Sequence, residues 1–127
     1  LVHKIAAANH GDTVQMWGTG LPLRQQLYVD DLCEILPVLL EKHNSSQPLI
    51  VAPTENLTIL HMSRALVEQT GKKITLSFDG DNRGQFRKDG NNKMLMEILG
   101  EYSFTSFEEG IKKTYDWYVQ NGVVNDS

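Results

Sequence analysis

The spacing of apolar residues predicts five helices along this chain. Between positions 30 and 43, apolar residues recur at intervals of three and four, which is typical of one buried helix face. Members of this face are Leu32, Ile35, Leu36, Leu39 and Leu40. Similar spacing predicts helices over 59–70 and 107–118, and two shorter helices are expected over 1–9 and 92–99.

Four short strands are expected between these helices. Residues 13–17 and 74–78 alternate polar and apolar side chains, which is the pattern of a strand with one buried face. Residues 24–29 are expected to be extended, and residues 48–52 form an apolar run bounded by prolines. Helices that alternate with a few short strands predict an α/β fold with a small sheet.

Local signals predict where several helices begin and end. Thr58 is a good N-cap and Gly71 a good C-terminal stop for the helix over 59–70. Asp30 or Asp31 is expected to cap the helix that follows, and Pro37 to kink it. The run TSFE at 105–108 fits a capping box for the last helix.

Length and charge narrow the class of protein. The chain has 127 residues, 40% of them apolar and 22% charged, which predicts one folded domain. A net charge of −4 argues against a nucleic-acid-binding domain. The single cysteine, Cys33, excludes an internal disulfide framework and is expected to be a small buried side chain. No apolar run is long enough for a membrane span, and an intracellular location is expected.

The first residue, Leu1, also bears on the class. A start at leucine, inside an expected helix, favours a piece of a longer protein.

The glycine turn at 18–20 is the first candidate for chemistry. A dinucleotide-binding loop needs a third glycine and an immediate helix, whereas position 23 is Leu23 and no helix follows. The pattern therefore favours an ordinary turn. Cations beside glycine turns are candidates for holding phosphate, and Trp17 for stacking on a ring. Solvated surface cations and a core tryptophan remain the alternative interpretation.

Several segments, in order, resemble nucleotide-sugar enzymes of the extended short-chain dehydrogenase/reductase family. They are WGTGLPLR at 17–24, VDDL at 29–32, GQFRK at 84–88, NK at 92–93 and the ending at 114–121. The resemblance covers nearly the whole chain. It implies the branch that epimerises and reduces a GDP-linked keto sugar with NADP(H), as a cytoplasmic homodimer.

The same resemblance implies a division of labour between two domains. In the family, an N-terminal Rossmann domain binds NADP(H) and holds the catalytic serine, tyrosine and lysine, and a smaller C-terminal domain binds the GDP-sugar. This sequence has no Tyr-x-x-x-Lys motif. We therefore expect residues 1–121 to be the substrate-binding domain and 122–127 a flexible tail. The chain alone is expected to be inactive, without cofactor or metal.

Four residues match the substrate-binding positions of the family. Lys4 matches a basic residue that contacts the nucleotide, and Trp17 a tryptophan that lines the sugar pocket. Arg24 matches the arginine of the diphosphate region, and Lys88 a lysine near the guanosine-diphosphate end.

Two positions depart from the family pattern. Gln26 replaces a phenylalanine, and Arg83 replaces an aspartate. The alternatives to this reading are the substrate domain of another nucleotide-sugar epimerase or dehydratase, and a non-catalytic interaction module.

Overall fold

A computed structural model describes residues 1–81 and 84–122 of the chain. Its helices are α1 (Val2–Ala6), α2 (Val29–Lys42), α3 (Ile59–Thr70), α4 (Lys93–Leu99) and α5 (Phe107–Gln120). Its strands are β1 (Thr13–Met16), β2 (Leu23–Arg24), β3 (Leu57–Thr58), β4 (Thr75–Phe78) and β5 (Arg87–Lys88). The predicted α/β fold with five helices is confirmed, with five short strands in the described part of the chain. Arg83 and the tail at 123–127 lie outside the described residues.

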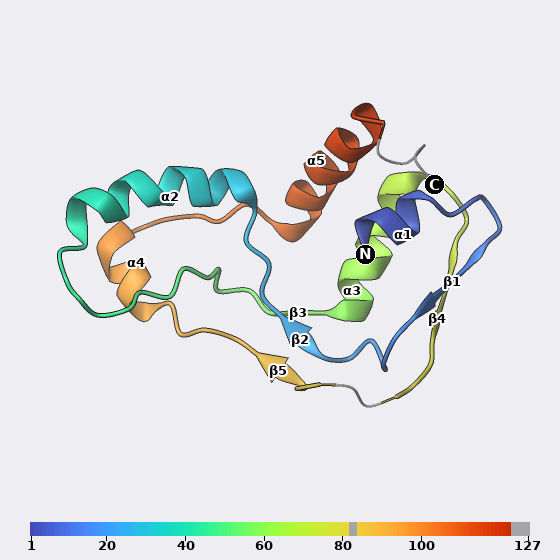
Figure 1. Ribbon diagram of the computed structural model, residues 1–127, viewed down its shortest axis with the longest axis horizontal. Helices are drawn as coiled ribbons and strands as arrows, with labels where there is room; N and C mark the ends of the chain where they lie inside the picture. Colours follow the sequence, from blue (N-terminus) through green and yellow to red (C-terminus); the bar gives the residue numbers. More distant parts are fainter. Residues whose placement is uncertain (82–83, 123–127) are drawn as a thin grey trace.

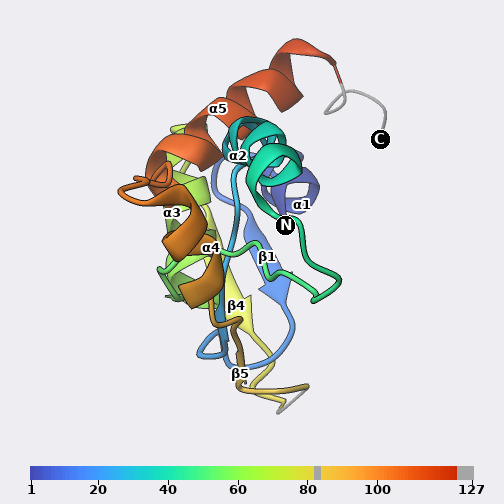
Figure 2. The same ribbon diagram turned by 90° about the vertical axis from the view of Figure 1, so that its left-hand side faces the viewer.

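The elements form two groups joined by a small ladder of strands. Helices α1, α3 and α5 gather at one end with β1 and β4, while α2 and α4 lie at the other end (Figure 1). Strands β2, β3 and β5 lie between the two groups, and the view from the side shows β5 at the far edge from α5 (Figure 2). The ladder therefore lies where the two halves of the molecule meet.

Both sheets are small and depend on pairing between distant segments. β1 and β4 pair in parallel from Thr13 opposite Thr75 to Met16 opposite Phe78. β2 is the centre of the second sheet, antiparallel to β3 and parallel to β5. Each parallel pair brings together strands about sixty residues apart in the sequence.

The hydrophobic core lies among α1, α3, α5 and β1. Its fully buried members include Ile5 and Leu66, with Val14 and Ile111 nearly so. At the other end of the molecule, Ile35 of α2 and Leu95 of α4 are also fully buried, where these two helices pack together. Each end of the molecule therefore has apolar side chains of its own to exclude water.

The predicted ends of α3 are confirmed. The Thr58 hydroxyl accepts a hydrogen bond of 3.0 Å from the His61 amide, which satisfies one free N–H of the first turn. Gly71 ends the helix with φ of +65°, a left-handed conformation that glycine adopts without steric cost. The cap of α5 lies one residue later than predicted, because Ser106 accepts from the Glu109 amide.

The expected cap of α2 is wrong. The N-cap is Tyr28, and no side chain caps it. The Asp31 carboxylate is instead buried, where it accepts hydrogen bonds from the amide and hydroxyl of Thr105. Long-range contacts have therefore replaced the local cap. The helix continues through Pro37 from Val29 to Lys42.

The expected burial of α2 is also partly wrong. Ile35 is buried, but Leu36 is 46% and Leu40 84% exposed, because the main helix contact of α2 is with α4 alone. Cys33, expected to be buried, is exposed. Helix α4 therefore covers only part of the apolar face of α2.

The strand expected at 48–52 does not form. A strand needs a neighbour whose amides and carbonyls can pair with its own, and the described residues offer none there. Side-chain amides bond to this region instead. Asn92 Nδ2 donates to the Ala52 carbonyl at 3.0 Å, and Gln25 Nε2 donates to the Pro53 carbonyl at 2.7 Å. Similarly, the extended segment expected over 24–29 is a strand only at Leu23–Arg24.

Candidate functional site

A cavity of about 500 Å³ opens beside the main core, between α1, β1 and the start of α5. Most of its lining is apolar, from residues such as Met16, Met62 and Ile111. Two of the predicted site residues, Lys4 and Trp17, also line it. We call this space the main cavity. An apolar pocket with a few polar groups is the usual form of a small-molecule site.

Lys4 and Trp17 reach the main cavity from neighbouring elements. The Lys4 ammonium donates a hydrogen bond to the carbonyl of Gln15 in β1. This bond directs the end of the Lys4 side chain from α1 toward the strand. Trp17 directly follows β1 and is 75% exposed. A large exposed aromatic ring on the rim of an apolar cavity is suited to stack on a ring of a ligand.

The turn after Trp17 requires glycine at position 20. Gly20 is buried and has φ of +78°, and a Cβ there would lie 2.9 Å from Cε1 of Phe78. Its carbonyl accepts a hydrogen bond of 2.8 Å from the Leu60 amide at the start of α3. The turn is therefore held tightly between β4 and α3, and it fixes the path of the chain from Trp17 to β2.

Arg24 is held at the centre of the three-stranded sheet. Its Nη1 donates to the Leu23 carbonyl at 2.7 Å, and its Nη2 donates to the Gln85 carbonyl at 2.9 Å. These two bonds fix the plane of the guanidinium and use only some of its N–H groups. The side chain is half-buried, so its orientation is set before any ligand arrives.

Lys88 lies directly beside Arg24 in the sheet. The parallel pairing of β2 with β5 places Arg24 opposite Lys88. Neighbouring strands lie about 4.8 Å apart, and residues in register project to the same face. The side chain of Lys88 is exposed and makes no hydrogen bond or ion pair within residues 1–81 and 84–122. Two cations on one face form a favourable site for a diphosphate.

The neighbouring cation, Arg87, is engaged differently. Its Nε donates to Asp89 Oδ1 at 2.9 Å, and this hydrogen bond, together with the charge of Asp89, raises the pKa of Arg87. Because its charge is balanced within the loop, Arg87 is a weaker candidate for phosphate than Lys88.

The structure thus brings the four predicted residues together as two pairs. Lys4 and Trp17 share the main cavity, whereas Arg24 and Lys88 share the β2–β5 register and do not line it. The segment from Arg24 to Gln26 leads from one pair to the other, because Gln26 lines the main cavity. Sequence reasoning noted Gln26 only as a departure from the family pattern, and did not identify Phe107 as a lining residue.

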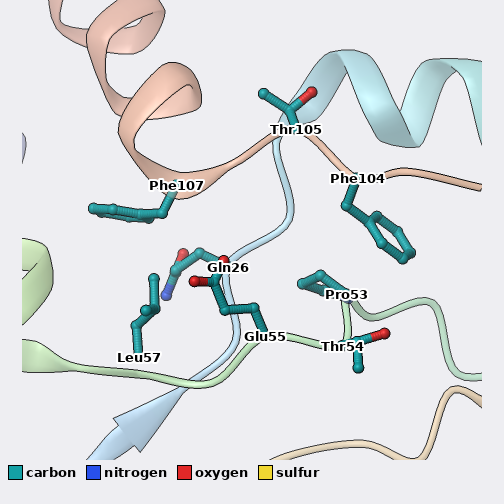
Figure 3. A pocket seen from close by; sticks show the side chains of 8 residues that line it. All are labelled: Gln26, Pro53, Thr54, Glu55, Leu57, Phe104, Thr105 and Phe107. Atoms are coloured by element: carbon teal, nitrogen blue, oxygen red, sulfur yellow. The ribbon is translucent and has the colours of Figure 1, made fainter.

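A smaller hollow of about 200 Å³ adjoins the main cavity and shares Gln26 and Phe107 with it. Figure 3 shows Phe107 and Leu57 on one side of this side hollow, and Pro53 and Phe104 on the other. Apart from Gln26, its polar lining comes from Glu55, Thr54 and Thr105. The side hollow and the main cavity therefore meet at Gln26 and Phe107.

The described residues do not fit a dinucleotide at the glycine turn. The turn at 18–20 leads into strand β2 rather than a helix, so no helix N-terminus faces a pyrophosphate there. The described ranges also hold no group of three or more His, Cys, Asp or Glu side chains placed for a metal ion. None of the helices in those ranges is long and apolar enough to cross a membrane.

Comparison with known proteins first shows which family the N-terminal part of the chain resembles. Residues 1–52 match the model of the NAD dependent epimerase/dehydratase family. Several relatives that are similar over nearly the whole chain are GDP-L-fucose synthases. The chain is 32% identical over 126 residues to the GDP-L-fucose synthase of Dictyostelium discoideum, covering 95% of this chain and 39% of that protein. It is 31% identical over 121 residues to GDP-L-fucose synthase 1 of Arabidopsis thaliana, covering 91% and 36%.

The fold agrees with the sequence comparison. A GDP-L-fucose synthetase from Naegleria fowleri bound to NADP superposes with a TM-score of 0.88 at 26% identity, over 94% of this chain and 39% of that chain. The resemblance inferred from the motifs is therefore confirmed. The chain spans less than two fifths of the length of these relatives.

Proposed function

We propose that this chain is the C-terminal, substrate-binding domain of a GDP-L-fucose synthase. The whole enzyme would convert GDP-4-keto-6-deoxymannose to GDP-L-fucose by epimerisation and NADPH-dependent reduction. Residues 1–121 would hold the GDP-sugar, and a separate Rossmann domain would bind NADP(H) and supply the catalytic serine, tyrosine and lysine. The whole protein would be a cytoplasmic homodimer. The chain alone would bind substrate without converting it.

The pairing of Arg24 with Lys88 carries this proposal. A diphosphate presents several anionic oxygens, and a guanidinium fixed by two backbone carbonyls can bind two of them at once. Lys88, in register beside it, adds a second positive charge. Lys4 and Trp17 would then contact the rest of the nucleotide-sugar in the main cavity. This arrangement positions a substrate, and positioning is a large part of catalysis.

Titration of the chain with GDP tests the proposal. Charge-assisted hydrogen bonds of this kind contribute about 1.5–3 kcal/mol, so Arg24→Ala should weaken GDP binding by about ten- to a hundredfold. Lys88→Ala should weaken it less, and the loss should shrink at high salt because this side chain is exposed. Arg64→Ala, on the exposed side of α3, is the matched control and should bind as the wild type does.

The result also separates the proposal from its alternatives. Equal GDP affinity in wild type, Arg24→Ala and Arg64→Ala would remove the site assignment. A folded chain that binds neither GDP nor GDP-mannose would favour an interaction module. A preference for UDP-sugars over GDP-sugars would favour another nucleotide-sugar epimerase or dehydratase.

A further inference from the structure

Two adjacent glutamines follow Arg24, and their side-chain amides have different surroundings. Gln25 Nε2 donates to the Pro53 carbonyl at 2.7 Å, and Gln25 Oε1 accepts from the Gly90 amide at 2.8 Å. This amide ties two loops together. The Gln26 amide has no hydrogen-bond partner within residues 1–81 and 84–122, and its side chain is exposed. Gln26 is therefore not needed to hold the described fold together.

Gln26 lies where the two hollows of the site meet. It lines both the main cavity and the side hollow, and its carboxamide lies on the side of Phe107 and Leu57 (Figure 3). The other polar groups of the main-cavity lining are the indole N–H of Trp17 and the ammonium of Lys4, which donates to the Gln15 carbonyl. In an apolar pocket, a few polar groups fix the orientation of the ligand. The carboxamide of Gln26 is such a group and is available to a ligand.

The distance along the chain from Arg24 places Gln26 beside the sugar of a bound nucleotide-sugar. Two residues separated by one other residue have Cα atoms no more than about 7 Å apart. Gln25, between them, is held by the Pro53 carbonyl and the Gly90 amide. A ligand with its diphosphate at Arg24 would therefore have one of the two groups that flank the diphosphate near Gln26. Because Gln26 shares the main cavity with Trp17, which matches the tryptophan of the sugar pocket, that group would be the hexose.

We infer that Gln26 is a specificity-determining residue that recognises hydroxyl groups of the sugar. The inference rests on the proposed function, since it assumes that the diphosphate lies at Arg24. A carboxamide both donates and accepts hydrogen bonds, which matches the donor and acceptor character of sugar hydroxyls. A purely apolar side chain at this position could contact the face of the ring but could not distinguish one arrangement of hydroxyls from another.

The test measures by NMR titration how tightly the 127-residue chain binds GDP and GDP-mannose. If Gln26 recognises the sugar, the wild type should bind GDP-mannose about five- to tenfold more tightly than GDP, the gain from about one net hydrogen bond. Gln26→Leu should abolish this preference and leave the dissociation constant for GDP within about twofold of wild type. The side-chain NH₂ signal lost in Gln26→Leu should shift in the wild type with GDP-mannose and not with GDP.

Gln25→Leu is the matched control, because it removes the same group one residue earlier. It should lower the unfolding temperature, whereas Gln26→Leu should not, and the preference for GDP-mannose should survive in the folded fraction. If Gln26→Leu keeps the wild-type preference, or if the wild type binds GDP and GDP-mannose equally, the inference is wrong while the proposed site stands. If the wild type binds neither ligand, the proposed function fails and the inference fails with it.

Discussion

The carboxylate of Asp31 accepts two hydrogen bonds of 2.8 Å from Thr105, one from its backbone amide and one from its hydroxyl. Asp31 lies in the first turn of α2, and Thr105 lies just before α5. The hydroxyl of Tyr102 also donates to Asp31 at 3.3 Å and to Glu34 at 2.9 Å. Burial, followed by the hydrogen bond to Glu34, raises the pKa of Tyr102 well above its usual range. Asp31 thus joins the two groups of helices.

Loss of this carboxylate should destabilise the fold. Asp31 is only 5% exposed, and Asp31→Asn would replace one of its two acceptor oxygens with an NH₂ group and remove the charge that strengthens the hydrogen bonds from Thr105. We expect the free energy of unfolding to fall by about 2–3 kcal/mol in urea denaturation, the cost of disrupting hydrogen bonds to a buried charge. Because Thr105 and Phe107 line the hollows at Gln26, ligand binding should weaken as well.

The neighbouring Asp30 provides the control. It is exposed in the same turn of α2, so Asp30→Asn should cost less than about 1 kcal/mol, through the helix dipole and the interaction of Asp30 with the Tyr28 hydroxyl. Equal losses for the two variants would show that the helix dipole, rather than the bonds to Thr105, accounts for the effect.

The contrast between Asp31 and Thr58 shows what the sequence could predict. The cap at Thr58 and the stop at Gly71 depend on residues within one turn of each other, so local chemistry determines them. Asp31 has the same capping chemistry, but a partner 74 residues away outcompetes the local amides. Nothing near Asp31 in the sequence distinguishes the two cases.

The strands also show that local sequence does not reveal which distant segment a residue will contact. Residues 13–16 and 75–78 were predictable because each alternates, although their pairing was not. Residues 48–52 have strand composition but lack a neighbouring strand in the described part of the chain, and composition alone does not supply one. Leu40, apolar and in helical register, is 84% exposed for a related reason, since burial depends on what packs against the helix.

The candidate site was predictable residue by residue, through the family resemblance, but not as an arrangement. The register of Arg24 with Lys88 joins strands 64 residues apart, and two-residue strands leave no periodic pattern to detect. The difference between Gln25 and Gln26 depends on the positions of Pro53 and Gly90, which no local rule gives.

Lys72 should stabilise both the fold and the proposed site. Its ammonium donates to the carbonyls of Ala6 and Ala8, at 3.1 and 2.8 Å, at the end of α1. A cation there satisfies free carbonyls and interacts favourably with the helix dipole. Lys72→Met should lower the free energy of unfolding by about 1.5–3 kcal/mol. Because α1 positions Lys4, calorimetric titration should also show weaker GDP binding.

Lys73 is the matched control for this change. Its side chain is exposed, and its backbone amide, which donates to His10 Nδ1 at 3.1 Å, survives any substitution except proline. The free energy of unfolding of Lys73→Met should therefore lie within about 0.5 kcal/mol of the wild-type value. If Lys72→Met and Lys73→Met have the same free energy of unfolding, the contacts of Lys72 with the two carbonyls contribute nothing to stability.

The contact between α3 and α5 should make stability depend on pH. His61 Nε2 and Glu108 Oε1 are 2.8 Å apart, and this hydrogen bond, followed by the bond from the backbone amide of Glu108, lowers the pKa of Glu108. A carboxyl whose pKa is lower in the folded state stabilises that state above its unfolded pKa of about 4.3. The contribution is lost as the pH falls through the folded value. Since both side chains are about half exposed, it should not exceed about 1 kcal/mol.

Urea denaturation of wild type and Glu108→Gln from pH 7 to pH 3 measures this contribution. At pH 7, where Glu108 is ionised in both states, the wild type should be more stable by up to about 1 kcal/mol. The difference should narrow below about pH 4.3 as Glu108 gains its proton. Glu101→Gln, at an exposed position in the loop before α5, should follow the wild type throughout. A wild-type advantage that stays constant down to pH 3 would show that the charge of Glu108 does not stabilise the contact with His61.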